Sequence, residues 1–172
     1  VVFETISKKW QFVFPEARPE VNKTIEGWKH WEQFKRELQE KPKTSLLAFQ
    51  LKIKNVSKRA DSLSLRVPET FNIPQVKSRL VTLNTKIKSL DTYIHLEEIP
   101  EKKVVALIGE INEEIKGVYT QWDEVFIKKA IPKEVGEDDM IRALDTTRLA
   151  KKKFQEEIIE NDKNKATDTI TK

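Results

Sequence analysis

The sequence predicts an all-α protein, an antiparallel up-and-down bundle of four to five helices. Three consecutive stretches repeat apolar residues at spacings of three and four, which places these side chains on one face of a helix. The apolar positions are Leu46, Phe49, Ile53, Val56, Ala60 and Leu63; Ile73, Val76, Leu80, Leu83, Ile87, Leu90 and Ile94; and Val104, Ile108, Ile111, Ile115, Val118, Trp122 and Val125. Short, proline-marked segments connect the stretches, so neighbouring helices should run in opposite directions.

The size and composition of the chain fit a single hydrophobic core. At 172 residues the chain is long enough to fold without a disulfide or a structural metal, and we expect one helical-bundle domain over residues 1–160. The absence of cysteine excludes disulfides, thiolate catalysis and cysteine-ligated metals. It also fits an exported protein better than a cytosolic one. No apolar stretch is long enough to span a membrane as a helix.

The first elements are an apolar N-terminal segment, residues 1–19, and a helix over 20–40. Part of the N-terminal segment has helical spacing and part alternates like a strand, so its conformation up to residue 14 stays open. A helix over 44–65 follows, with Thr44 as its expected N-cap. Its end is set by Pro68, which disfavours helical geometry at the residue before it.

Three further helices are expected, over 73–96, 100–129 and 138–160. Proline near the start of the first two suits the first turn of a helix. The third has a poorer apolar stripe, because Thr147, Arg148 and Lys151 interrupt it, so only its ends look able to dock. Residues 161–172 lack the apolar content to pack, and we expect a disordered tail.

The residue types and spacings that usually carry enzyme chemistry are missing. The two histidines, His30 and His95, have no glutamate three residues before them, so the sequence holds no dimetal motif of the helical-bundle kind. There is no glycine-flanked serine elbow and no glycine-rich phosphate loop. We therefore expect no catalytic residues, no metal and no cofactor. A small-ligand carrier with a cavity between helices is a further alternative.

Aromatic residues are densest at Trp28 and Trp31, which lie three residues apart on one helical face. One interpretation is a stacking platform or a binding hot spot for a partner. The interpretation that we favour is a core position against Trp122, because a first helix that covers the bundle needs large apolar side chains.

A basic stretch offers a candidate anion-binding surface. The net charge is +4, and no acidic residue occurs between Glu40 and Asp61. The candidates within this stretch are Lys52, Lys54, Lys58 and Arg59. They would bind membrane head groups or nucleic acid phosphates, although a solvated face without a ligand explains the same charges. Of the two ligands, we do not expect nucleic acid, because aromatic residues are not interleaved with the basic ones.

The N-terminal segment offers a candidate partner-binding surface, because it is rich in large apolar residues and lies outside the three stripes. The candidates are Phe3, Ile6, Trp10, Phe12 and Phe14. Packing of the segment on its own bundle is the alternative, and we favour it.

A resemblance in overall sequence character extends over about two thirds of the chain. It is clearest in three segments: residues 37–58, residues 77–94 and Ile99–Pro100–Glu101–Lys102–Lys103. In them the chain resembles uncharacterised bacterial helical-bundle proteins of the exported or lipoprotein type. The resemblance brings no motif of known chemistry. It implies an extracytoplasmic location, periplasmic or lipid-anchored, with a signal segment before Val1.

Together these observations lead to a non-enzymatic interaction or structural module, with another protein or a second copy as its partner. The alternative is binding to an anionic surface through the basic stretch. The oligomeric state stays open, because an apolar stripe packs equally well within one chain and between two.

Overall fold

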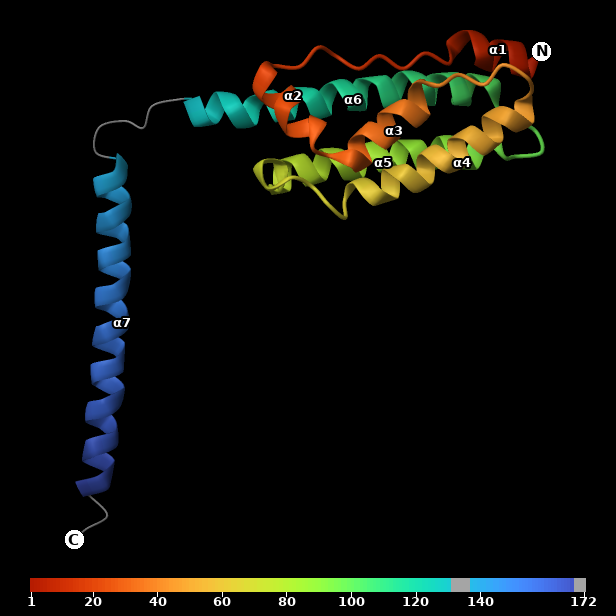
Figure 1. The fold of residues 1–172 in the computed structure, drawn as a ribbon. Helices are drawn as coiled ribbons and strands as arrows, with labels where there is room; N and C mark the ends of the chain where they lie inside the picture. The colour runs from red at the N-terminus through yellow and green to blue at the C-terminus, as the bar shows by residue number, and fades with distance from the viewer. Residues whose placement is uncertain (131–136, 169–172) are drawn as a thin grey trace. The chain divides into compact units, whose positions relative to one another are not determined.

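The computed structural model describes residues 1–130 and 137–168, and every regular element in these ranges is helical (Figure 1). The predicted all-α class is therefore confirmed. By its internal contacts the chain forms two compact units, Val1–Ala130 (unit 1) and Ile131–Lys172 (unit 2). Each unit is described by itself.

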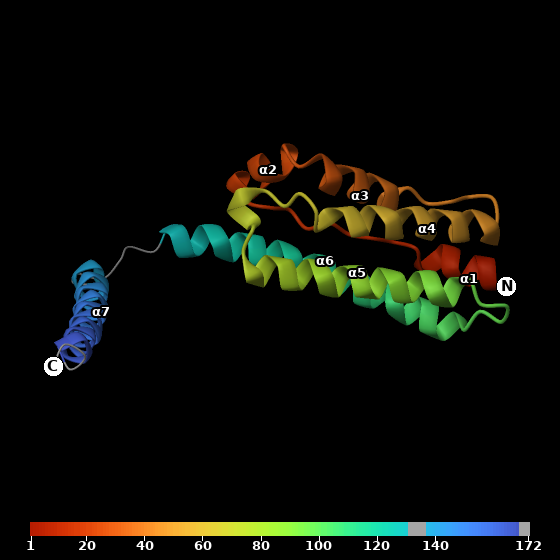
Figure 2. The same cartoon turned by 90° about the horizontal axis from the view of Figure 1, so that it is seen from below.

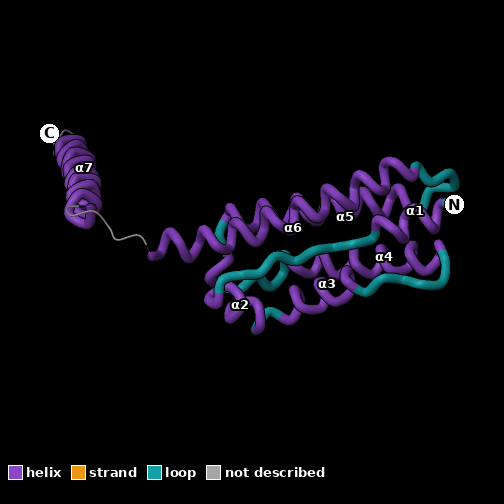
Figure 3. The backbone as a smooth tube through the Cα atoms, turned by 90° about the horizontal axis from the view of Figure 1, so that it is seen from above, coloured by secondary structure: helices purple, strands orange, loops and turns teal. Residues whose placement is uncertain are grey.

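Unit 1 begins with a short helix, an extended stretch and two more helices. Helix α1 spans Val2–Lys9, α2 spans Pro19–Glu26 and α3 spans Lys29–Gln39. Between α1 and α2, residues 10–18 form an extended segment, here called the N-terminal strap, which is the long loop between these helices in Figure 3. The segment whose conformation the sequence left open is thus helical first and extended afterwards.

The helix predicted over residues 20–40 is two helices in the structure. The break lies at Gly27 and Trp28, where Trp28 has φ −98° and ψ 84°, outside the helical region. Glycine lowers helix stability by about 1 kcal/mol relative to alanine, which makes Gly27 a favourable place for the chain to turn. Trp28 and Trp31 are both buried across this turn.

Three longer helices follow: α4 over Leu46–Leu63, α5 over Pro74–Ile94 and α6 over Glu101–Ala130, with a single 3₁₀ turn at Glu69–Phe71. The cap of α4 is Ser45, not the predicted Thr44, because Ser45 Oγ accepts the Ala48 N–H at 3.3 Å. Pro74 occupies the first turn of α5, as expected.

Helix α5 packs along both α4 and α6, and α3 lies along the other side of α4 (Figures 1 and 2). Helices α1 and α2 contact α6. The three predicted stripes form the interior of this arrangement: all their residues are buried except Leu46 and Ile73, which are partly buried. Ser57 is the one buried polar residue in the described part of unit 1, so the interior is almost entirely apolar.

The described part of unit 2 is one helix, α7, over Glu137–Asp168. It begins close to the predicted start but continues through residues 161–168, where the sequence predicted a tail; residues 169–172 lie outside the described residues. Neither proline nor glycine occurs after Gly136, so nothing stops the helix early. Its large apolar side chains are exposed: Met140, Ile141, Leu144, Leu149, Phe154, Ile158 and Ile159.

Candidate functional site

The four basic candidates of α4 have different surroundings, and the first, Lys52, is held by two carboxylates. Its Nζ lies 2.9 Å from Glu37 Oε1 and 3.1 Å from Glu40 Oε2, and its side chain is 14% exposed. Burial alone would lower the pKa of Lys52, but the hydrogen bonds to Glu37 and Glu40 outweigh burial and raise the pKa above its ordinary value. Lys52 therefore pairs with its own chain rather than facing an anion.

Lys54 projects from a different side of α4. It lines a shallow depression of about 440 Å³ beside the end of α5, together with Asp91, Thr92, His95 and Leu96. His95 Nδ1 lies 3.1 Å from Asp91 Oδ1, so a carboxylate and an imidazole already face each other there. The mixed charge of this depression does not favour an anion.

Lys58 and Arg59 are the two candidates that the structure brings together. They line a groove of about 300 Å³ with Glu37, Asn55 and Ser62, between α3 and α4. The guanidinium of Arg59 donates from Nη1 to Gln33 Oε1 at 3.0 Å. The predicted basic surface is thus divided: Lys52 is paired, Lys54 stands apart, and Lys58 and Arg59 share one groove.

The candidate partner-binding residues of the N-terminal segment lie against the chain itself. Ile6, Trp10 and Phe12 are buried, and Phe3 and Phe14 are partly buried. The rings of Phe3 and Trp10 contact that of Phe49, with centroids 5.5 and 4.9 Å away, and Phe14 contacts Trp31 at 6.0 Å. This burial favours self-packing, since a partner would reach these side chains only if the segment left unit 1.

A polar contact that the sequence analysis missed holds the N-terminal strap on α6. The side chain of Asn112 accepts the Val13 N–H at 2.9 Å and donates to the Gln11 carbonyl at 2.8 Å. Its amide thus pairs with the extended backbone much as a neighbouring strand would. The available signal was an asparagine directly beside the apolar stripe of residues 104–125.

The predicted core role of the tryptophans is confirmed. The ring of Trp122 lies 5.9 Å from that of Trp28 and 4.8 Å from that of Trp31, and it stacks on Phe71 at 5.1 Å. The indole N–H groups of Trp28 and Trp122 have no hydrogen-bond partner among the described residues. The cluster therefore gains its stability from buried ring area rather than from polar contacts.

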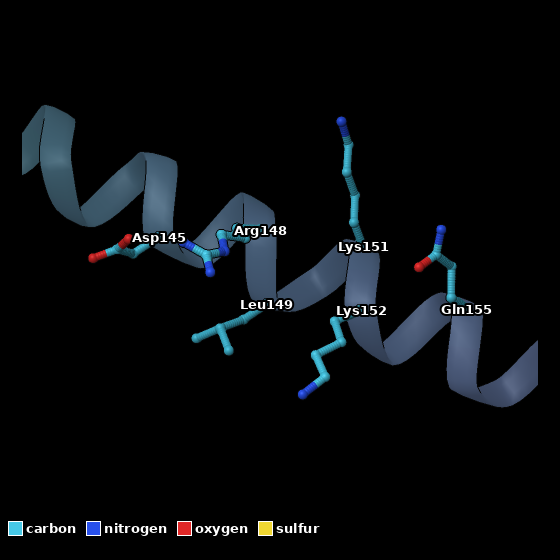
Figure 4. Close-up of a pocket in the computed structure, with 6 residues that line it drawn as sticks. All are labelled: Asp145, Arg148, Leu149, Lys151, Lys152 and Gln155. Atoms are coloured by element: carbon cyan, nitrogen blue, oxygen red, sulfur yellow. The ribbon is translucent and has the colours of Figure 1, made fainter.

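Helix α7 presents a surface rather than an enclosed site. Figure 4 shows side chains that line one depression there, and all of them come from the same helix and point in different directions: Asp145, Arg148, Leu149, Lys151, Lys152 and Gln155. Such a surface has no walls to exclude water.

Across residues 1–130 and 137–168, no three His, Cys, Asp or Glu side chains are grouped so that they could hold a metal ion. No helix there combines the length and apolar content of a membrane span.

No protein-family model, no curated protein and no solved structure matches this chain. Three features distinguish its described residues: the apolar interior of unit 1, the exposed apolar residues of α7 and the groove at Lys58 and Arg59.

Proposed function

We propose that this protein is a non-enzymatic interaction module in which unit 1 is an antiparallel up-and-down bundle and α7 binds a second copy of the chain. The interior of unit 1 supports the first part of the proposal. Catalysis needs polar groups that converge on one point, whereas Ser57 is the one buried polar residue among those described. The short connections between α4, α5 and α6 support the antiparallel arrangement.

The observation that carries the proposal is the exposed apolar face of α7. Met140 and Leu144 are 68% and 66% exposed near one end, and Phe154 and Ile158 are 65% and 46% exposed near the other. A helix gains most of its stability from burying such a face rather than from its intrinsic propensity. Exposed apolar clusters of this kind are typical of interaction sites.

The spacing of this face favours a second copy of α7 as the partner. The face is made of residues spaced alternately four and three apart, at positions 140, 144, 147, 151, 154 and 158. This series of spacings reads the same from either end, with Leu149 at its midpoint. Two antiparallel copies would therefore place Met140 opposite Ile158 and Leu144 opposite Phe154. The apolar ends of one copy would cover those of the other.

The polar centre of the face decides between the two orientations. In an antiparallel pair Lys151 faces Thr147 of the other copy, whereas a parallel pair would set Lys151 against its own equivalent. Like charges at a core position destabilise a pair, so the antiparallel orientation is favoured. Arg148 adds positive charge near the centre, and we expect the dimer to be weak and reversible.

Cross-linking tests the orientation directly, because the chain has no cysteine of its own. Ala150 flanks the predicted two-fold axis, so Ala150→Cys should be joined to its equivalent by a short bismaleimide. Met140→Cys is the control: an antiparallel pair separates its two copies by about 27 Å along the helix axis, whereas a parallel pair places them side by side. Cross-linking through Met140→Cys but not Ala150→Cys would contradict the antiparallel pair.

Sedimentation velocity tests the face itself. Leu144→Asp combined with Phe154→Asp should abolish the dimer, because both substitutions place a charge in the apolar contact. The matched control is Leu149→Asp, which is also an exposed leucine, 64% exposed, but lies on the opposite side of α7. A wild-type protein that stays monomeric up to about 200 µM would overturn the proposal, because so weak a contact would fall outside the usual range of specific association.

A further inference from the structure

The groove between α3 and α4 has a built arrangement of donors that the interaction function does not use. Asn55, Lys58, Arg59 and Ser62 line it, and their positions i, i+3, i+4 and i+7 lie on one side of α4. Glu37 closes the groove from α3. All of these residues belong to unit 1, so the groove is independent of α7.

The positive charge of this groove is not compensated by an acidic partner. Arg59 is oriented by Gln33, whose amide oxygen is neutral and leaves the guanidinium charge in place. Among the described residues, the Lys58 ammonium makes no ion pair or hydrogen bond. The amide of Asn55 is likewise exposed and adds a further donor.

The one carboxylate that lines the groove is already paired. Glu37 Oε1 accepts Lys52 Nζ at 2.9 Å, on the side of α4 that turns toward α3. Lys52 is mostly buried there and is also bound to Glu40, which fixes it beside Glu37. Lys52 is shared between Glu37 and Glu40, so these three groups leave one negative charge, and with Lys58 and Arg59 the groove keeps a net charge of +1.

We infer that this groove binds a phosphate group, with Arg59 and Lys58 facing its charge and Asn55 donating a hydrogen bond. Guanidinium groups suit phosphate because their planar N–H donors match two of its oxygens. Ser62 borders the groove but is not one of the phosphate donors, because its hydroxyl donates to the Lys58 carbonyl at 3.2 Å. The phosphate is either that of a small soluble molecule or that of a lipid head group.

Nuclear magnetic resonance titration of the full chain with inorganic phosphate tests the inference, with sodium chloride at matched ionic strength as the reference. Amide signals of residues 55–62 should shift with phosphate and saturate. Lys58→Gln combined with Arg59→Gln should weaken binding at least about tenfold, since two charge-assisted contacts are lost. The matched control is Lys43→Gln combined with Lys54→Gln, which removes the same charge from α4 and its preceding loop outside the groove and should change binding less than about twofold.

Vesicles separate the two sources of phosphate. Flotation with phosphatidylcholine vesicles that contain phosphatidic acid, compared with phosphatidylcholine alone, reports binding to a head group. Saturable binding of inorganic phosphate supports a soluble ligand. Vesicle binding that needs Lys58 and Arg59, in a protein that does not bind inorganic phosphate, supports a lipid. If neither probe binds, if chloride causes the same shifts, or if both double variants weaken binding equally, the inference is overturned. Thermal unfolding of both variants checks that each still folds.

Discussion

Helices α6 and α7 are nearly equal in length, 30 and 32 residues, yet their apolar side chains differ in exposure. Helix α6 buries nine residues in the interior of unit 1. On α7, every large apolar side chain that the structure describes is exposed. The difference follows from the middle of each stripe: α6 continues through Ile111 and Ile115, whereas α7 has Thr147 and Lys151 at the corresponding places. Continuity of the stripe, not helix length, separates a core helix from an exposed one.

The largest expected effect contrasts the two helices directly. Trp122→Ala on α6 should lower the free energy of unfolding by about 3–5 kcal/mol, because it removes a fully buried ring that contacts Trp31 and Phe71. Phe154→Ala on α7 should change the free energy of unfolding of unit 1 by less than about 0.5 kcal/mol, since Phe154 is exposed. Denaturant unfolding followed by tryptophan fluorescence measures both. Similar losses in the two variants would break the contrast.

The next effect sharpens the contrast by making α7 resemble α6. Thr147→Leu combined with Lys151→Leu fills the interrupted stripe and removes the central positive charge. We expect the affinity of the α7 pair to rise at least about a hundredfold, because each buried leucine contributes about 1.5–3 kcal/mol when its side chain is covered. Sedimentation equilibrium over a concentration series gives the dissociation constant. The same two substitutions made at Thr146 and Lys153, outside the stripe, should leave it unchanged.

A smaller effect concerns the N-terminal strap on α6. Asn112→Ala removes the acceptor for the Val13 N–H and the donor to the Gln11 carbonyl, and should destabilise unit 1 by about 1–2 kcal/mol. Hydrogen exchange at the Val13 amide should become faster at the same time. Thr120→Ala is the control on α6, because its hydroxyl bonds only to the Lys116 carbonyl of the same helix. Unchanged exchange at Val13 would show that apolar packing alone holds the strap.

The smallest effect concerns the ion pair between α3 and α4. Lys52→Gln should lower the free energy of unfolding by about 1 kcal/mol at neutral pH, because Glu37 and Glu40 lose a partly buried partner. The folded-state pKa of Lys52 is raised, so its contribution is complete below the unfolded pKa of about 10.4 and is lost as pH rises through the folded pKa. Denaturant unfolding from pH 7 to above about pH 11 should therefore bring wild type and variant together. Lys54→Gln, which removes no such pair, should change the free energy of unfolding at neutral pH by less than about 0.5 kcal/mol.

The features that could be predicted are those that depend on the spacing of residues within a single helix. The stripes specified which faces of α4, α5 and α6 are buried. Trp28 and Trp31 are buried as expected, although Trp28 lies at the break between α2 and α3 and not on a shared helical face. Contacts between elements were not predictable in the same way. The partners of Lys52 lie 15 residues away on α3 and 12 residues away at the residue that follows α3. Which turn of α3 faces which turn of α4 depends on packing that no local pattern encodes.

The candidate site was predicted in part for the same reason. The acid-free stretch identified Lys58 and Arg59, but it also included Lys52, whose carboxylate partners are Glu37 of α3 and Glu40 directly after it. The candidates of the N-terminal segment were chosen for their large apolar side chains, and the same property buries them against Phe49 and Trp31. Apolar character alone does not distinguish a surface for a partner from a surface for the chain's own core.

The amide of Asn112 also sets an order of events during synthesis. Its bond to the Val13 N–H joins residues 99 positions apart, so this contact cannot form until residue 112 has been made. Chains emerge from the ribosome with the N-terminus first, so the ring of Trp10 meets Phe49 of α4 before the backbone of the strap meets Asn112. The N-terminal strap is therefore held by aromatic packing first, and its polar contact with α6 is among the last in unit 1 to form.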